Sequence, residues 1–118
     1  MVKVNILFEY KEDEDGYFES DNVKYDINKI FTLSENLPVL YSEVSLLDWI
    51  LEYDNPDISD RNDIDYDIPI LITYYNITEL LVVDGVHRLK KCIQDGNTQI
   101  KIKFLPEYVM KSSIIKKG

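Results

Sequence analysis

The segment from Leu80 to Lys90 constrains the fold of this chain more than any other. Its first residues, Leu80–Val83, form an apolar run that predicts a buried strand ending at Asp84-Gly85. From Val86 to Gln94 the apolar side chains follow helical spacing instead. The chain is therefore expected to pass directly from a strand into a helix at Gly85, which requires a fold that contains both elements.

The residues at this turn predict a phosphate site. His87, the only histidine, and Arg88, one of two arginines, lie in the first turn of the expected helix. The first N–H groups of a helix lack intrahelical partners, and the helix dipole favours an anion beside them. Gly85 would let the backbone approach a ligand closely, and Arg88 would add a forked, permanently charged donor. The candidate binding residues are thus Asp84, Gly85, Val86, His87 and Arg88.

The other segments predict one α+β domain over residues 1–118, with a small mixed, partly antiparallel sheet and two or three helices. Strands are expected at 69–74, 79–83 and 99–104, the first two as a hairpin, and Gly96 ends the helix that begins after Gly85. Ser45 to Asp48 reads as a capping box that opens a short helix, with Trp49 in the core.

The two ends of the chain are expected to flank a core at residues 39–105. Residues 1–38 predict an N-terminal extension with strands at 1–10 and 17–20, a charged turn at 11–16, and a further strand or helix from Val23. Residues 106–118 predict a short helix or a loose tail.

Charge is distributed unevenly along the chain, whose net charge is −9. Residues 1–87 carry 20 acidic and 5 basic side chains, whereas residues 88–118 carry 2 acidic and 8 basic ones. Since nucleic-acid binding rests first on a basic surface, we do not expect direct binding to DNA or RNA. No apolar run is long enough to predict a membrane span, and the single cysteine, Cys92, favours a reducing cytoplasm.

The most acidic stretch is residues 52–67, with seven acidic side chains against Arg61 alone. Pro56 and the absence of periodicity predict a loop. Asp63–Asp67 is similar to the start of a calcium loop but lacks the required glycine and the later glutamate, so no metal site is expected there. The loop offers a surface for a basic protein partner. Its carboxylates, Asp65 or Asp67 for example, are also candidates for a purely structural pairing with His87 and Arg88.

The succession Pro69–Ile72, Leu81–Leu89, Gly96 and Ile100–Ile102 resembles the ParB/sulfiredoxin superfamily. Members place a strand, then a second strand that ends in an Asp-Gly or Gly-Gly turn, then His-Arg or Arg-Arg, a helix, a glycine and a strand. The resemblance covers about residues 39–105 and implies a ParB/sulfiredoxin-like fold.

In that superfamily the turn receives nucleotide phosphates: CTP in partition proteins, ATP in sulfiredoxins, and ADP or ATP in free-serine kinases. The resemblance implies that Gly85, His87 and Arg88 contact phosphate. It implies that Asp84 shapes the turn or approaches a metal or hydroxyl. Some members are kinases that use an acidic residue as general base; the acidic loop offers too many candidates to choose one, and Asp84 is the candidate closest in sequence, so the catalytic residue is left unknown. ATP or CTP, with Mg²⁺, is the implied cofactor, and phosphotransfer or NTP hydrolysis the implied chemistry.

Two departures from the family remove some of its activities. Sulfiredoxins carry their catalytic cysteine directly before His-Arg, where this chain has Val86, so sulfinic-acid reduction is not expected. Partition proteins carry a DNA-binding helical domain after this one, for which 118 residues leave no room. An alternative to nucleotide binding is a non-enzymatic, acidic protein-binding module, of the kind that phages and plasmids use as inhibitors or adaptors, which acts by nucleic-acid mimicry.

Overall fold

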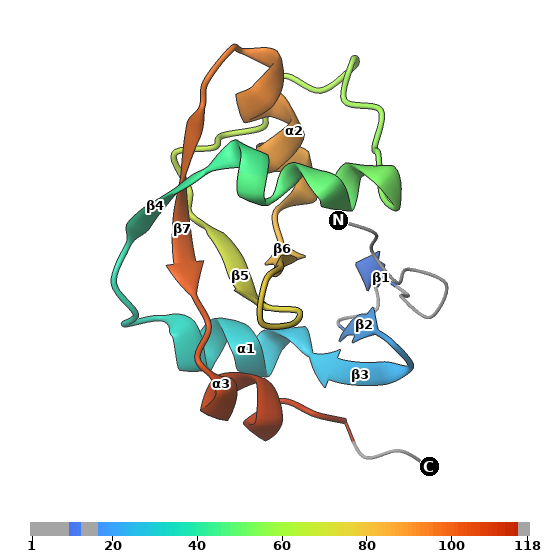
Figure 1. The fold of residues 1–118 in the computed structure, drawn as a ribbon, viewed down its shortest axis with the longest axis vertical. Helices are drawn as coiled ribbons and strands as arrows, with labels where there is room; N and C mark the ends of the chain where they lie inside the picture. Colours follow the sequence, from blue (N-terminus) through green and yellow to red (C-terminus); the bar gives the residue numbers. More distant parts are fainter. Residues whose placement is uncertain (1–9, 13–16, 116–118) are drawn as a thin grey trace. The chain divides into compact units, whose positions relative to one another are not determined.

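The computed structural model describes residues 10–12 and 17–115, and it is an α+β structure (Figure 1). The chain divides into two compact units, one formed by Asn36–Pro106 and the other by Met1–Glu35 with Glu107–Gly118. The described residues form three α-helices and a mixed sheet, which confirms the α+β prediction. The ParB/sulfiredoxin-like topology stays a prediction.

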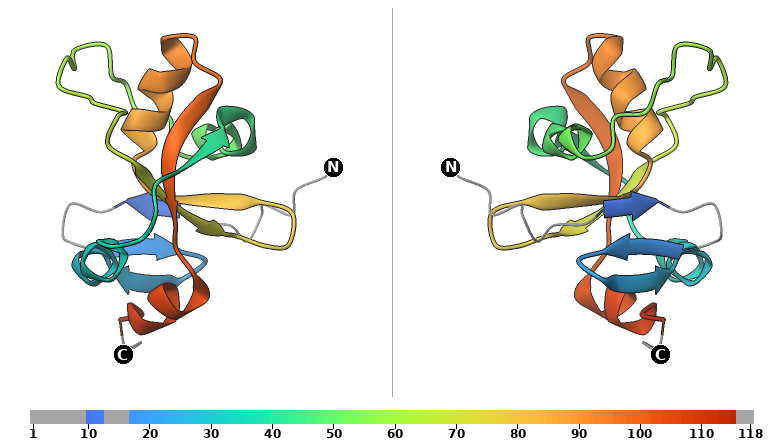
Figure 2. Two further views of the ribbon diagram at one scale, coloured as in Figure 1. Left: turned by 90° about the vertical axis from the view of Figure 1, so that its left-hand side faces the viewer. Right: turned by 90° about the vertical axis from the view of Figure 1, so that its right-hand side faces the viewer.

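The unit Asn36–Pro106 is built on a four-stranded sheet in the order β4-β7-β5-β6 (Figure 2). β4 (Leu40–Glu43) runs antiparallel to β7 (Gln99–Phe104), and β7 runs parallel to β5 (Ile70–Tyr74). β5 and β6 (Leu80–Asp84) form the expected antiparallel hairpin. β4 is the one strand of this sheet that the sequence did not predict.

The predicted helix after Gly85 is α2 (Val86–Gln94). Val86, Leu89 and Cys92 share one fully buried face of α2, as their helical spacing requires. The helix ends at Asp95, and Gly96 follows with a φ of +82°, the left-handed conformation that favours glycine after a helix.

The helix expected after Ser45 is instead two short 3-10 helices, Val44–Leu46 and Asp48–Glu52. The predicted capping box is wrong, because Ser45 lies inside the first 3-10 helix and Leu47 separates the two with φ −118° and ψ −20°. The prediction that Trp49 is a core residue is confirmed. Its side chain is 8% exposed, and its indole Nε1 donates to the Leu80 carbonyl at 2.7 Å.

The other unit contains an antiparallel sheet of β1 (Tyr10–Glu12), β2 (Tyr17–Ser20) and β3 (Val23–Asp26), followed by α1 (Ile27–Ser34). Asp26 caps α1 by accepting a hydrogen bond from the Lys29 N–H at 3.2 Å. The buried apolar side chains of this unit are Phe18, Ile30, Val109 and Met110.

The end segments follow the sequence expectations in part. Residues 106–118 contain the short helix, α3 (Glu107–Ser112), and residues 17–20 are a strand as expected. The charged turn at 11–16 is wrong for Lys11 and Glu12, which belong to β1 because they pair with β2. Of the strand expected at 1–10, Tyr10 belongs to β1, and residues 1–9 lie outside the described residues, as does the rest of the turn at 13–16.

Candidate functional site

Gly85 shapes the turn between β6 and α2. It is the N-cap of α2, with φ +113° and ψ 25°, a conformation that residues with a side chain rarely adopt. A Cβ atom on Gly85 would lie 2.5 Å from Cγ2 of Ile70, the first residue of β5. Only glycine satisfies both the dihedral angles and the available space, so Gly85 allows the start of α2 to pack against β5.

Arg88 makes three hydrogen bonds that join the segments around this turn. Its Nη1 donates to the carbonyl oxygens of Pro69 at 2.9 Å and Ile68 at 3.2 Å. Its Nη2 donates to Oδ2 of Asp84 at 2.7 Å. The side chains of Arg88 and Asp84 are 17% and 20% exposed. Arg88 therefore connects the first turn of α2 to the end of β6 and to the residues that lead into β5.

The pairing of Arg88 with Asp65 or Asp67, offered as a structural alternative, is wrong. The Asp67 carboxylate lies 3.3 Å from Nζ of Lys101, and Asp65 accepts a hydrogen bond from the Asp67 N–H at 2.9 Å. Helical side chains point back toward the N-terminus, so the Arg88 guanidinium reaches Asp84 instead.

The first turn of α2 retains the backbone features of an anion site. Gly85 supplies no side-chain cap, and the first turn contains no acidic side chain. The N–H groups of this turn therefore keep the partial positive charge of a helix N-terminus. Val86 is fully buried, whereas His87 and Arg88 are partly exposed. The accessible part of the turn is formed by His87 and Arg88.

His87 lies within electrostatic range of residues 52–67, which are called the acidic segment below. In this segment, Nε and Nη2 of Arg61 donate to the carboxylate of Asp63 at 2.7 and 3.1 Å. These hydrogen bonds are the main reason that the pKa of Asp63 is lowered, and the charge of His87 contributes less. An anion that binds at His87 would therefore be repelled by the Asp63 carboxylate, whereas a cation would be attracted to this carboxylate.

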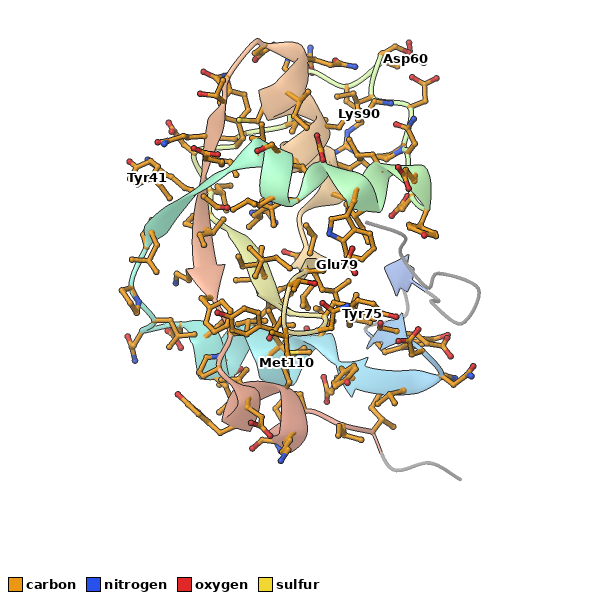
Figure 3. All side chains as sticks on the ribbon, viewed as in Figure 1. Tyr41, Asp60, Tyr75, Glu79, Lys90 and Met110 are labelled. Atoms are coloured by element: carbon orange, nitrogen blue, oxygen red, sulfur yellow. The ribbon has the colours of Figure 1, made fainter. Side chains whose placement is uncertain are left out.

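The acidic segment has no helix or strand after Glu52, which confirms the predicted loop, yet it is attached to its own unit at several points. Nζ of Lys90 in α2 donates to the carbonyl of Pro56, and Figure 3 shows Lys90 beside this segment. Ile58 is 4% exposed, and the Tyr66 hydroxyl donates to Asp95 at 3.0 Å. No local sequence pattern reveals these anchors, because their partners lie far away along the chain.

The anchored segment exposes most of its acidic side chains. The pKa of Asp57 is lowered by backbone and side-chain hydrogen bonds from Ser59, so this carboxyl stays ionised at neutral pH. The exposed acidic residues of the segment are Glu52, Asp57, Asp60, Asp63, Asp65 and Asp67.

Cys92 has the environment of a structural thiol. It is fully buried on α2, and its Sγ donates to the Gln99 carbonyl at 3.4 Å. Burial raises the pKa of this thiol, and the nearby charge of Asp95 raises it further. A thiol held in its neutral form is a poor nucleophile.

Among residues 10–12 and 17–115, no three His, Cys, Asp or Glu side chains form a group that could hold a metal ion. In the same residues, no helix has both the length and the apolar character that crossing a membrane requires.

Comparison with protein-family models, curated proteins and solved structures finds no match for this chain. What the chain binds is therefore inferred from the geometry of the β6–α2 turn and of the acidic segment.

Proposed function

We propose that the β6–α2 turn binds a phosphate-bearing ligand, and that this ligand is a nucleotide, as the ParB/sulfiredoxin resemblance implies. The observation that carries the proposal is the N-terminus of α2, where a glycine cap in a left-handed conformation leaves the first turn without a side-chain cap. Such a turn presents backbone N–H groups and a positive helix dipole to an anion.

The residues of the turn have different roles in this proposal. The backbone N–H groups of His87 and Arg88, which lie at the accessible part of the turn, donate to phosphate oxygens. The His87 imidazole adds a hydrogen bond in either protonation state. Gly85 and Val86 form the buried floor of the turn.

Arg88 acts as a positioning residue. Its three hydrogen bonds fix the turn. Asp84 holds the Arg88 guanidinium, and this pairing competes with the metal or catalytic role that the resemblance implies for Asp84. The proposal therefore concerns binding and makes no claim of turnover.

Thermal unfolding in the presence of ATP, CTP, GTP, ADP or inorganic phosphate, with and without Mg²⁺, tests the proposal. A ligand at about 100 times its Kd stabilises the folded state by about 2.7 kcal/mol, which is readily detected. His87→Ala removes only the imidazole hydrogen bond, so it should reduce the stabilisation without changing the fold. Gln94→Ala, an exposed position at the other end of α2, should keep it. An unchanged midpoint with every nucleotide and with phosphate would contradict the proposal.

A second candidate function is binding of a basic protein through the acidic segment. The observation that favours it is the anchoring of that segment by Lys90, Ile58 and Tyr66, which holds a row of exposed carboxylates in place. A fixed array of negative charge is complementary to a surface that itself binds nucleic acid. Capture from a bacterial lysate that is lost in Asp60→Lys/Asp65→Lys but kept in His87→Ala would favour this function over the first.

A further inference from the structure

The two edge strands of the four-stranded sheet differ in how exposed their side chains are. At the β6 edge, Leu81, Val82 and Val83 are each at most 4% exposed, and the Trp49 indole bonds the Leu80 carbonyl. β4 forms the other edge of the sheet. Within its own unit, β4 lies at the outer margin beyond β7 (Figure 1), with Tyr41 projecting there (Figure 3).

The β4 edge carries exposed apolar side chains. Val39, Leu40 and Tyr41 are 48%, 47% and 64% exposed, and Leu46 just after β4 is 54% exposed. Sheet edges that combine open backbone groups with apolar side chains are sites at which another strand pairs.

The register shows which backbone groups of β4 face away from β7. The Val44 N–H donates to the Thr98 carbonyl at 2.9 Å, so Val44 and Thr98 are a hydrogen-bonded pair. Such pairs recur at every second residue of an antiparallel ladder. The backbone N–H and C=O groups of Ser42 and Leu40 therefore also point toward β7. The N–H and C=O groups of Tyr41 and Glu43 therefore point to the open edge, and those of Val39 do so if the strand is continued.

We propose that a second copy of this chain pairs with β4 along this edge, antiparallel and about a two-fold axis, with Tyr41 opposite Tyr41 of the second copy. In this register the outward groups of Val39 meet those of Glu43 of the second copy. The pairing extends the sheet across both molecules through groups that β7 does not use.

Side-chain chemistry supports this register over one that opposes like charges. Tyr41 and Glu43 lie on the sheet face that also carries Lys101, the cross-strand neighbour of Tyr41. Continuing the β4–β7 register by one residue aligns Val39 with Lys103. In the proposed register, Val39 lies between Lys103 of the same copy and Glu43 of the second copy, on one cross-strand line. Glu43 of the second copy is therefore on the same line as a basic side chain, and the two Glu43 residues are not opposite each other.

The association is closed and salt-dependent. The proposed interface joins the same edge of each copy about a two-fold axis, so pairing through it stops at two copies. Each copy has a net charge of −9, so the copies repel at long range. Added salt screens this repulsion and should strengthen the dimer, whereas it would weaken the binding of a basic partner.

Sedimentation and amide hydrogen exchange over a concentration series reaching about 1 mM, the range of small interfaces, test the proposal. We expect dimers, and we expect the Val39, Tyr41 and Glu43 amides to gain protection with concentration while those of Leu40 and Ser42 are protected throughout. Tyr41→Glu should abolish the dimer, because it places two carboxylates opposite each other at the two-fold axis. Within a single copy the new carboxylate lies beside Lys101, its cross-strand neighbour, so the fold should tolerate it. Ile77→Glu is the matched control, since Ile77 is 97% exposed in the β5–β6 turn and the charge change is the same.

A protein that stays monomeric at every concentration and salt level overturns the proposal. A dimer that survives Tyr41→Glu also overturns it, as does concentration-dependent protection at Leu40 and Ser42 instead of Tyr41 and Glu43. Circular dichroism of Tyr41→Glu confirms that loss of the dimer does not reflect loss of the fold.

Discussion

Nη2 of Arg88 lies 2.7 Å from the carboxylate of Asp84, across the glycine turn that joins β6 to α2. The same guanidinium bonds the carbonyls of Pro69 and Ile68 through Nη1. One arginine therefore determines how the first turn of α2 is held against β5 and β6. This relationship makes the candidate site rigid, and it leads to the first prediction.

Arg88→Ala should lower the free energy of unfolding by about 2–3 kcal/mol, because it leaves one carboxylate and two carbonyl groups without their charged donor. Arg88→Lys should fall between the wild type and Arg88→Ala, since lysine keeps the charge but loses the fork. Urea unfolding measures both variants. Arg61→Ala is the matched control and should change little, because Arg61 forms its pair in an exposed position.

Gly85→Ala should be more destabilising than Gly96→Ala by at least about 1 kcal/mol. Both glycines have a positive φ, so both substitutions impose backbone strain of about 1 kcal/mol or more. Only at Gly85 does the added Cβ also meet a neighbour, Ile70, whereas nothing lies within 4 Å of a Cβ on Gly96. Equal loss of stability in the two variants would show that packing against β5 is unimportant.

Stability should decline in mildly alkaline solution because of Cys92. Burial raises the pKa of the folded thiol above the ordinary value of about 8.5. The stabilising contribution is full below about pH 8.5 and is lost as the pH rises through the folded pKa, at up to about 1.4 kcal/mol per pH unit. Unfolding midpoints between about pH 7.5 and 9.5 should fall in the wild type. A similar decline in Cys92→Ala would assign the effect to another group.

Lys90→Ala should loosen the acidic segment without unfolding its unit. The Lys90 ammonium bonds the Pro56 carbonyl, and loss of a charged donor of this kind costs about 1.4 kcal/mol, or about tenfold in local opening. Hydrogen exchange should quicken by about that factor in the acidic segment alone. Lys111→Ala is the matched control, because its exposed partner Glu107 lies in α3, which belongs to the other unit, so exchange in the acidic segment should stay unchanged.

The elements around the turn were predictable because their patterns are local. The apolar run before Asp84, the helical spacing after Gly85 and the glycine at 96 each depend on neighbours in sequence, and β5, β6 and α2 lie where they were expected. The strand β7 followed from its alternation, and every second residue, Ile100 and Ile102, is buried.

The misses have a common physical origin in contacts between distant residues. β4 has an exposed side chain at three of its four positions and no apolar alternation, so only its pairing with β7 identifies it as a strand. The partners of Arg88 include two backbone carbonyls, Ile68 and Pro69, which no side-chain pattern reveals. The sequence therefore indicated the candidate residues of the turn. It predicted that Arg88 contacts a phosphate, whereas the guanidinium makes its hydrogen bonds within the protein.

Amide NMR during titration with ATP and Mg²⁺, and separately with inorganic phosphate, tests phosphate binding at the β6–α2 turn most directly. The account predicts that the largest shifts are those of the amides of residues 87 and 88, that they saturate, and that saturation needs more ligand in His87→Ala but not in Gln94→Ala. Absence of shifts at these amides, or shifts confined to residues outside 84–89, would contradict the account.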